Sequence, residues 1–232
     1  MQKKIKTDLF EFNYADSLQQ LVDETLKILP SKIEEYKKFF DLDFNEKLVL
    51  NYFDNKEEFR NFIYDIRGEK ESLPSYAMGT YDNEMVNACI IPEKQMNSIY
   101  MANHELFHII YLKYILKNDI EKRIVWYDEG MAKFMSGETD KYKDEESFKK
   151  YYLYVKENTK EYPNLNEVNH GTSFANDKYN VYHLGYLCIR YLYETLGYDE
   201  FRKLPYDIDR IKEYGNDIVN KMFDYYDNKY SK

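Results

Sequence analysis

Apolar residues recur along the chain at two different spacings, which predict both helices and strands in its first half. Residues 17–40 carry an apolar stripe at helical spacing, which predicts a helix that breaks into two pieces at Pro30. The run at residues 47–53 is mostly apolar and is followed by Asp-Asn, so it predicts a buried strand and a turn. Residues 56–66 return to helical spacing, and Gly68 predicts the end of that helix.

The rest of the chain is predicted to hold one or two further strands and then mainly helices. The strands lie within residues 76–91, where Met85–Ile91 has the strongest pattern, and a long loop is expected at residues 159–178. The helices are predicted over residues 98–117, 127–136, 145–157, 181–196, 199–204 and 207–226. This order favours an α+β fold in a single domain, residues 1–232. Its N-terminal α/β lobe would cover about residues 1–97, and a mainly helical lobe would cover about residues 98–232.

Charge and composition limit the classes of partner that this domain is expected to bind. With 33 basic and 42 acidic residues, the chain has a net charge of −9 and is acidic overall, whereas a non-specific nucleic-acid-binding protein needs a basic surface. No apolar run reaches the roughly 18 residues of a membrane-spanning helix, and the N-terminus has no apolar leader segment. We therefore expect no nucleic acid and no membrane span. The protein would be cytoplasmic as given, or secreted if a leader was removed, and the pattern predicts no particular oligomeric state.

The segment that carries chemistry is His104-Glu105-Leu106-Phe107-His108, which holds two of the four histidines of the chain. On a helix, residues four apart lie on the same face, so both imidazoles can bind one zinc ion. Glu105 lies about 100° further round the helix. Its carboxylate would therefore lie beside the metal, where it can take a proton from a bound water molecule.

A pair of core histidines without a metal is the alternative for this segment. The predicted helix is apolar nearly all round, with Met101, Ile109 and Ile110 among its residues. Two imidazoles and a carboxylate are costly to bury in such surroundings unless they are paired or bind a metal. The sequence therefore favours a zinc site with His104 and His108 as ligands.

A catalytic zinc site usually has three protein ligands, and the next candidates are Asp128 and Glu129 in the segment Val125-Trp-Tyr-Asp-Glu-Gly-Met-Ala132. HELFH followed by W-x-x-E-G-x-A resembles the gluzincin metallopeptidases. The resemblance implies that Glu129 is the third ligand on a second helix, with Asp128 as the alternative. It also implies that small residues such as Gly130 let this helix pack close to the HExxH helix.

The resemblance extends more weakly to the residues before these motifs. The strand and helix at residues 48–66 look like the start of the small bacterial peptidase MA-like domains. That likeness implies a zincin-like fold with the active-site helix between the two lobes. These domains carry an edge strand just before the active-site helix, and Met85–Ile91 occupies that place here. By resemblance, a peptide or protein substrate would bind in extended form along this strand.

A further catalytic group is suggested by Tyr182-His183-Leu184-Gly185, which resembles the Y-x-x-G element of gluzincin aminopeptidases. The resemblance implies that the Tyr182 hydroxyl stabilises the oxyanion of the tetrahedral intermediate. His183 is the alternative, because a histidine performs this task in thermolysin-like enzymes. Tyr179 and Tyr186 are further candidates.

Two departures from relatives refine the expected activity. The chain has no Gly-x-Met-Glu-Asn motif, which the large aminopeptidases use to bind a free N-terminus, so an endopeptidase is favoured. The third histidine of the metzincins is also absent. We therefore expect zinc-dependent hydrolysis of peptide bonds with Glu105 as the general base. The alternatives are a regulatory or partner-binding zinc protein of zincin fold, and a helical interaction module without a metal.

Overall fold

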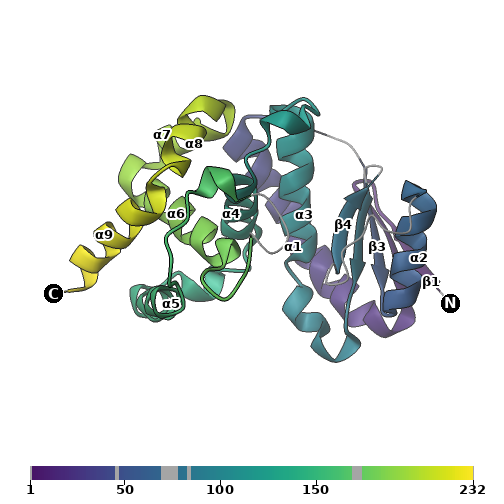
Figure 1. Cartoon of the computed structure of the whole chain (residues 1–232). Coiled ribbons are helices and arrows are strands. Elements are labelled where there is room, and N and C mark those ends of the chain that lie inside the picture. The colour runs from purple at the N-terminus through teal and green to yellow at the C-terminus, as the bar shows by residue number, and fades with distance from the viewer. Residues whose placement is uncertain (1, 45–46, 69–77, 83–84, 169–173, 232) are drawn as a thin grey trace. The chain divides into compact units, whose positions relative to one another are not determined.

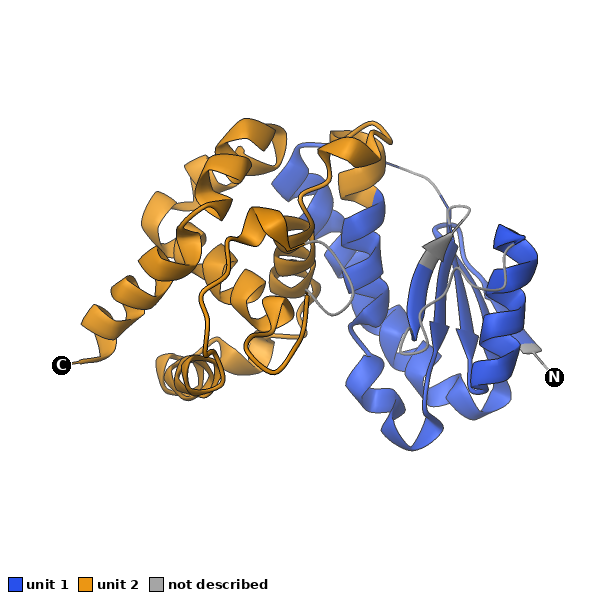
Figure 2. Cartoon of the chain, viewed as in Figure 1, with its two compact units in different colours: residues 1–109 blue, residues 110–232 orange. Residues whose placement is uncertain are grey.

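The structure is a computed structural model that describes residues 2–44, 47–68, 78–82, 85–168 and 174–231. The chain divides into two compact units, residues 1–109 and 110–232 (Figure 2). The sequence places the border between its two lobes near residue 97. In the structure the units divide at the end of the helix that carries the HExxH motif.

The first unit is built around a five-stranded sheet with the strand order β1-β2-β3-β5-β4 (Figure 1). The strands are β1 (Gln2–Lys6), β2 (Phe10–Ala15), β3 (Leu48–Phe53), β4 (Gly79–Asp82) and β5 (Met85–Cys89). β2, β3 and β5 run parallel, and β1 and β4 pair with their neighbours in the antiparallel sense. This mixed sheet and the helical second unit agree with the predicted α+β class.

β3 and β5 confirm the two clearest predicted strands, whereas β1 and β2 have no counterpart in the sequence prediction. The missed signal lies in β2, where Phe10, Phe12 and Tyr14 are buried and alternate with partly exposed residues. That spacing of two is the pattern of a strand with one buried face. β1 has no such alternation, so only its pairing with β2 identifies it.

β5 is an interior strand, because it pairs with β3 on one side and with β4 on the other. The expectation that a substrate pairs with Met85–Ile91 as an edge strand is therefore wrong. The strand at that edge of the sheet is β4. The apolar pattern misleads here because it is strongest in strands that are covered on both faces and both edges, whereas edge strands are short and more polar.

α2 (Lys56–Arg67) covers one face of the sheet (Figure 1). The side chain of Asn55 accepts hydrogen bonds from the first turn of this helix, and Gly68 ends it in the left-handed conformation, as the sequence predicts. Helix and sheet share a buried cluster of four residues: Phe53, Phe59, Ile63 and Cys89.

α1 (Gln19–Phe40) is one continuous helix, so the predicted break at Pro30 is wrong. A proline removes one backbone hydrogen bond from a helix interior. Pro30 lies on the exposed side, however, and the buried stripe continues past it through Ile33 and Tyr36. Burying each such side chain contributes roughly 1.5–3 kcal/mol, which outweighs the one lost bond.

The second unit is helical. Its helices are α4 (Val125–Ser136), α5 (Glu145–Glu157), α6 (Val181–Leu196), α7 (Tyr198–Phe201), α8 (Ile208–Gly215) and α9 (Ile218–Tyr230). The bounds of α5 and α6 agree with the prediction, whereas the predicted helix at residues 207–226 is divided into α8 and α9. In the part of the chain that the structure describes, no helix combines the length and the apolar character needed to cross a membrane.

Candidate metal centre and active site

α3 (Met101–Ile110) carries His104 and His108, and their imidazole rings lie next to each other with centroids 4.9 Å apart. The four-residue spacing predicts this proximity. His108 is buried and His104 is partly exposed. The α-helical geometry ends earlier than predicted, because a π-helical turn, Tyr111–Ile115, follows α3 directly.

Contacts with α1 fix the rotation of α3 about its own axis. The hydroxyl of Tyr36 donates a hydrogen bond of 2.8 Å to the carbonyl oxygen of Asn103. The ring of Phe107 packs against Tyr36 and Phe40, with centroid distances of 6.2 and 5.7 Å. Because Phe107 is fully buried in this aromatic group, the direction of the neighbouring histidines is fixed as well.

Glu105 lies beside the edge strand β4. A Cβ atom added to Gly79 would be 3.6 Å from Oε1 of Glu105, which is an ordinary van der Waals distance. The phenol of Tyr52 on β3, which interacts electrostatically with Glu105, is fully buried. Burial, together with the negative charge of Glu105, raises the pKa of Tyr52, so this phenol stays protonated. Glu105 itself is partly exposed, so its carboxylate is accessible to water.

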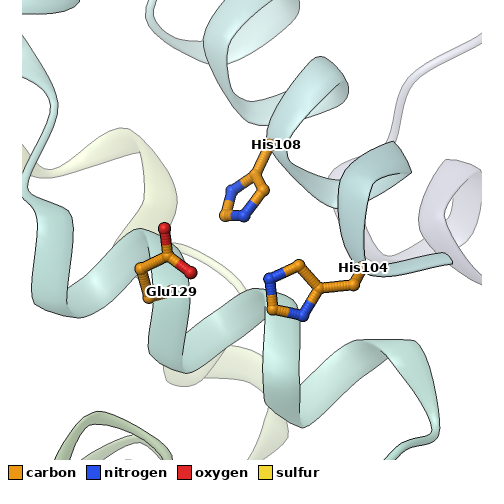
Figure 3. Close-up of side chains that lie close together, drawn as sticks. All are labelled: His104, His108 and Glu129. Atoms are coloured by element: carbon orange, nitrogen blue, oxygen red, sulfur yellow. The ribbon is translucent and has the colours of Figure 1, made fainter. Parts of the chain in front are cut away.

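Glu129 on α4 completes a group of three metal-binding side chains. One ligand atom each of His104, His108 and Glu129 lies within 4.8 Å of the other two. Figure 3 shows both imidazoles and the carboxylate directed towards a common space. Two imidazoles and one carboxylate are the donor set of a three-ligand catalytic zinc site, so these residues fit the metal that the sequence predicts.

Asp128, the alternative ligand, takes part in a different interaction. Its side chain is completely buried and bonds the guanidinium of Arg123 at 2.5 Å. The same guanidinium lies 3.3 Å from Oε1 of Glu129. Arg123 is not among the candidate residues that the sequence motifs indicate. The available signal was one arginine just before a helix whose first two turns hold adjacent carboxylates.

Gly130 of the W-x-x-E-G-x-A motif and Gly185 of the Y-x-x-G element allow α4 and α6 to pack closely. A Cβ atom on Gly130 would lie 2.7 Å from the carbonyl oxygen of Gly185, and one on Gly185 would lie 2.9 Å from that of Trp126. Neither position has room for a side chain, because the obstacles are backbone atoms. The expectation that Gly130 serves close packing with the HExxH helix is therefore corrected: the close approach at Gly130 is to α6.

Tyr182 and His183 occupy the first turn of α6 and have different surroundings. Tyr182 is 44% exposed, and its ring meets Phe174 edge-on. His183 is partly buried, and its Nδ1 shares a hydrogen bond of 2.7 Å with the hydroxyl of Tyr151 on α5. Burial and, to a lesser extent, the charge of Lys133 lower the pKa of His183 to about 4, so its imidazole is neutral at pH 7.

The HExxH helix, the His-His-Glu donor set and the α+β fold together define a metal-dependent hydrolase of the metalloprotease class. Residues 3–232 match the family model for collagenase, peptidase family M9, and the chain belongs to this family of metallopeptidases. Its members depend on a metal, typically zinc, and act on proteins or peptides. No curated protein matches the sequence.

Proposed function

We propose that this protein is a zinc endopeptidase of the gluzincin type, in which His104, His108 and Glu129 hold the metal. The observation that carries the proposal is the proximity of three ligand atoms within 4.8 Å, from residues of two separate motifs. A bound zinc ion would activate a water molecule and polarise the scissile carbonyl. Glu105, next to the first ligand on α3, would take the proton of that water and later deliver it to the leaving amine.

Tyr182 is the group that we assign to the oxyanion. Gly185 and Ile189 on α6 both approach Gly130 of α4, the residue next to Glu129. Tyr182 lies one helical turn before Gly185, so it belongs to the same stripe of α6. Its exposure leaves it accessible to a substrate. His183 is turned to Tyr151 on α5 by its hydrogen bond, which favours Tyr182 over His183.

The substrate is proposed to bind in extended form along β4. β4 is the edge strand of the sheet, and Gly79 on this strand lies within van der Waals reach of the Glu105 carboxylate. An edge strand offers backbone donors and acceptors that a peptide can pair with. A peptide held there would have its backbone beside the proposed general base.

The metal site is tested by measuring zinc in untagged protein purified without added zinc. About one zinc ion per chain in the wild type, and its loss in Glu129→Ala, is the expected result. Glu105→Gln should keep its zinc, because this side chain is no ligand. A protein that neither contains nor takes up zinc would exclude the proposed site.

Endopeptidase activity is tested with a library of peptides blocked at both ends. Wild type should cleave them, and Glu105→Gln should lose about 100- to 10,000-fold in rate, which is the usual contribution of a general base. Glu93→Gln is the matched control, because Glu93 is exposed and lies in the turn before α3. Full zinc content with no cleavage of any blocked or free peptide would favour the alternative of a zinc-binding regulatory protein.

A further inference from the structure

We propose that Arg123 is a positioning residue for the metal ligand Glu129, and that Asp128 is the anchor that holds Arg123 in place. This inference rests on the proposed zinc site. It concerns a residue outside the HExxH and W-x-x-E-G-x-A motifs, and it gives Asp128 a role that differs from metal binding. The evidence is one guanidinium shared by two successive carboxylates.

The positive charge of Arg123 is electrostatically unfavourable at its place just before α4 unless nearby carboxylates compensate it. Arg123 lies two residues before the first residue of α4, and its side chain is only 19% exposed. The N-terminus of a helix carries a partial positive charge, so a buried cation there is destabilised. Asp128 and Glu129 supply the negative charges that offset this repulsion.

Asp128 fixes the guanidinium because it is itself immobile. Its side chain is completely buried, and a buried carboxylate requires a charged partner. A guanidinium is a planar fork of donors, so its contact with Asp128 also fixes the direction of its remaining N–H groups. One of these nitrogens, an Nη atom, is 3.3 Å from Oε1 of Glu129.

A carboxylate held in this way is oriented before the metal arrives. A carboxylate has two oxygens, so Glu129 can accept a hydrogen bond at one oxygen and bind a metal through the other. Without Arg123, the side chain of Glu129 would lose this hydrogen bond, and that part of its order would have to be supplied when the metal binds. Partners of metal ligands typically contribute about 10- to 100-fold to metal affinity.

Arg123 also lines an open cavity of about 520 Å³, whose other walls include Ile124, Leu165 and Asn216. Removing the side chain of Arg123 would enlarge this space next to Asp128. A small guanidinium ion from solution could then enter and take the place of the missing group. This gives the inference a test by chemical rescue.

The experiment measures zinc affinity by competition with a chromophoric chelator in the full-length protein. Arg123→Ala is expected to bind zinc about 10- to 100-fold more weakly than wild type. Arg123→Lys should lie between the two, because an ammonium keeps the charge but cannot contact both carboxylates as a fork. Guanidinium chloride at a non-denaturing concentration should restore part of the affinity of Arg123→Ala, whereas sodium chloride at the same concentration should not.

Arg190→Ala and Arg190→Lys are the matched controls. Arg190 is a similarly buried arginine on α6, 13% exposed, that bonds Glu194 and the carbonyl oxygen of Tyr142. Its variants report the effect of losing a structural arginine, and they should bind zinc as wild type does. The absorption spectrum of the Co²⁺-substituted protein is a second readout, which should change in the Arg123 variants and stay the same in the Arg190 variants.

Two failures are distinguishable in this design. If Glu129→Ala binds zinc as tightly as wild type, the proposed metal site is wrong. If Glu129→Ala loses zinc but the Arg123 variants match the Arg190 variants in affinity and Co²⁺ spectrum, the metal site stands and the positioning role of Arg123 is overturned.

Discussion

The two helices that supply the candidate metal ligands, α3 and α4, are built in different ways. On α3 the ligands are four residues apart, and their rings are brought together by the helix itself. On α4 two adjacent carboxylates compete for the role of ligand, and they point about 100° apart on the helix. Asp128 is completely buried against Arg123, whereas Glu129 joins the group with the two histidines.

The comparison separates the ligands that are positioned by their own helix from the ligand that depends on its surroundings. The histidine pair depends on one helix and its repeat of 3.6 residues per turn. The choice of the carboxylate depends on charged and packed neighbours outside α4, among them Arg123 just before the helix and Gly185 on α6. Changing the spacing of the histidines on α3 should therefore abolish their binding of zinc. On α4, changing the residues around Glu129 should weaken zinc binding.

The largest effect is expected when the spacing on α3 is changed without changing its composition. His108→Ile combined with Ile109→His moves the second imidazole by about 100°, so the two histidines no longer share one face. Positions 108 and 109 are 7% and 6% exposed, so burial is matched. We expect loss of zinc and a fall in hydrolysis of more than about 100-fold. Normal zinc content in this variant would show that His108 is not a ligand.

Next in size is the contrast between the two neighbouring carboxylates of α4. Asp128→Asn removes the completely buried charge that contacts the guanidinium of Arg123, so the free energy of unfolding should fall by about 3–5 kcal/mol. Glu129→Gln should change stability much less and should lose more zinc affinity than Asp128→Asn does. Urea unfolding of the metal-free proteins and zinc titration measure the two quantities. The reverse result would identify Asp128 as the ligand.

A smaller effect is expected at the helix pair α4–α6. Gly130→Ala puts a Cβ atom 2.7 Å from a backbone oxygen, so the helices must move apart, at a cost of about 1–3 kcal/mol in the free energy of unfolding. Gly79→Ala is the control, since its Cβ would meet nothing closer than 3.6 Å. Thermal or urea unfolding compares the two variants. Equal stability of Gly130→Ala and wild type would contradict the close packing described for this pair.

The smallest effect concerns the pH dependence of stability through His183. Its pKa is about 4 in the folded protein, against 6.5 ordinarily, so the unfolded chain takes up the proton first. Stability should therefore be full above pH 6.5 and decline as the pH falls from 6.5 towards 4. The loss should be about 1 kcal/mol at pH 6 relative to pH 8. His183→Asn should flatten this part of the profile, as measured by urea unfolding from pH 8 to pH 5.

Repeating the measurement of stability against pH in the presence of zinc tests whether His183 belongs to the metal site. If His183 lies outside the metal site, as its bond to Tyr151 favours, this part of the pH profile should be the same with and without zinc. A shift of the profile on zinc binding would instead place His183 in the catalytic group and weaken the assignment of Tyr182.

Much of the fold could be predicted from spacing alone, and the failures have identifiable causes. α5 and α6 match their predicted bounds, because each has a clear apolar stripe and a side-chain cap at its start. The prediction that Pro30 breaks a helix is wrong, because the buried apolar stripe of α1 continues on both sides of this proline and stabilises the helix. β1 and the edge position of β4 depend on pairing between strands, which no single strand encodes.

The features of the candidate site also fall into those that the sequence predicts and those that depend on tertiary contacts. The histidine pair and the neighbouring Glu105 could be predicted from the sequence, because helical geometry relates residues that are a few positions apart. Three other features become visible only in the folded protein: β4 rather than β5 is the edge strand, Gly130 approaches α6, and Arg123 in the segment before α4 contacts Asp128 and Glu129. These features depend on contacts between elements, and such contacts are set by packing and charge in three dimensions, which a one-dimensional pattern of apolar and polar residues does not contain.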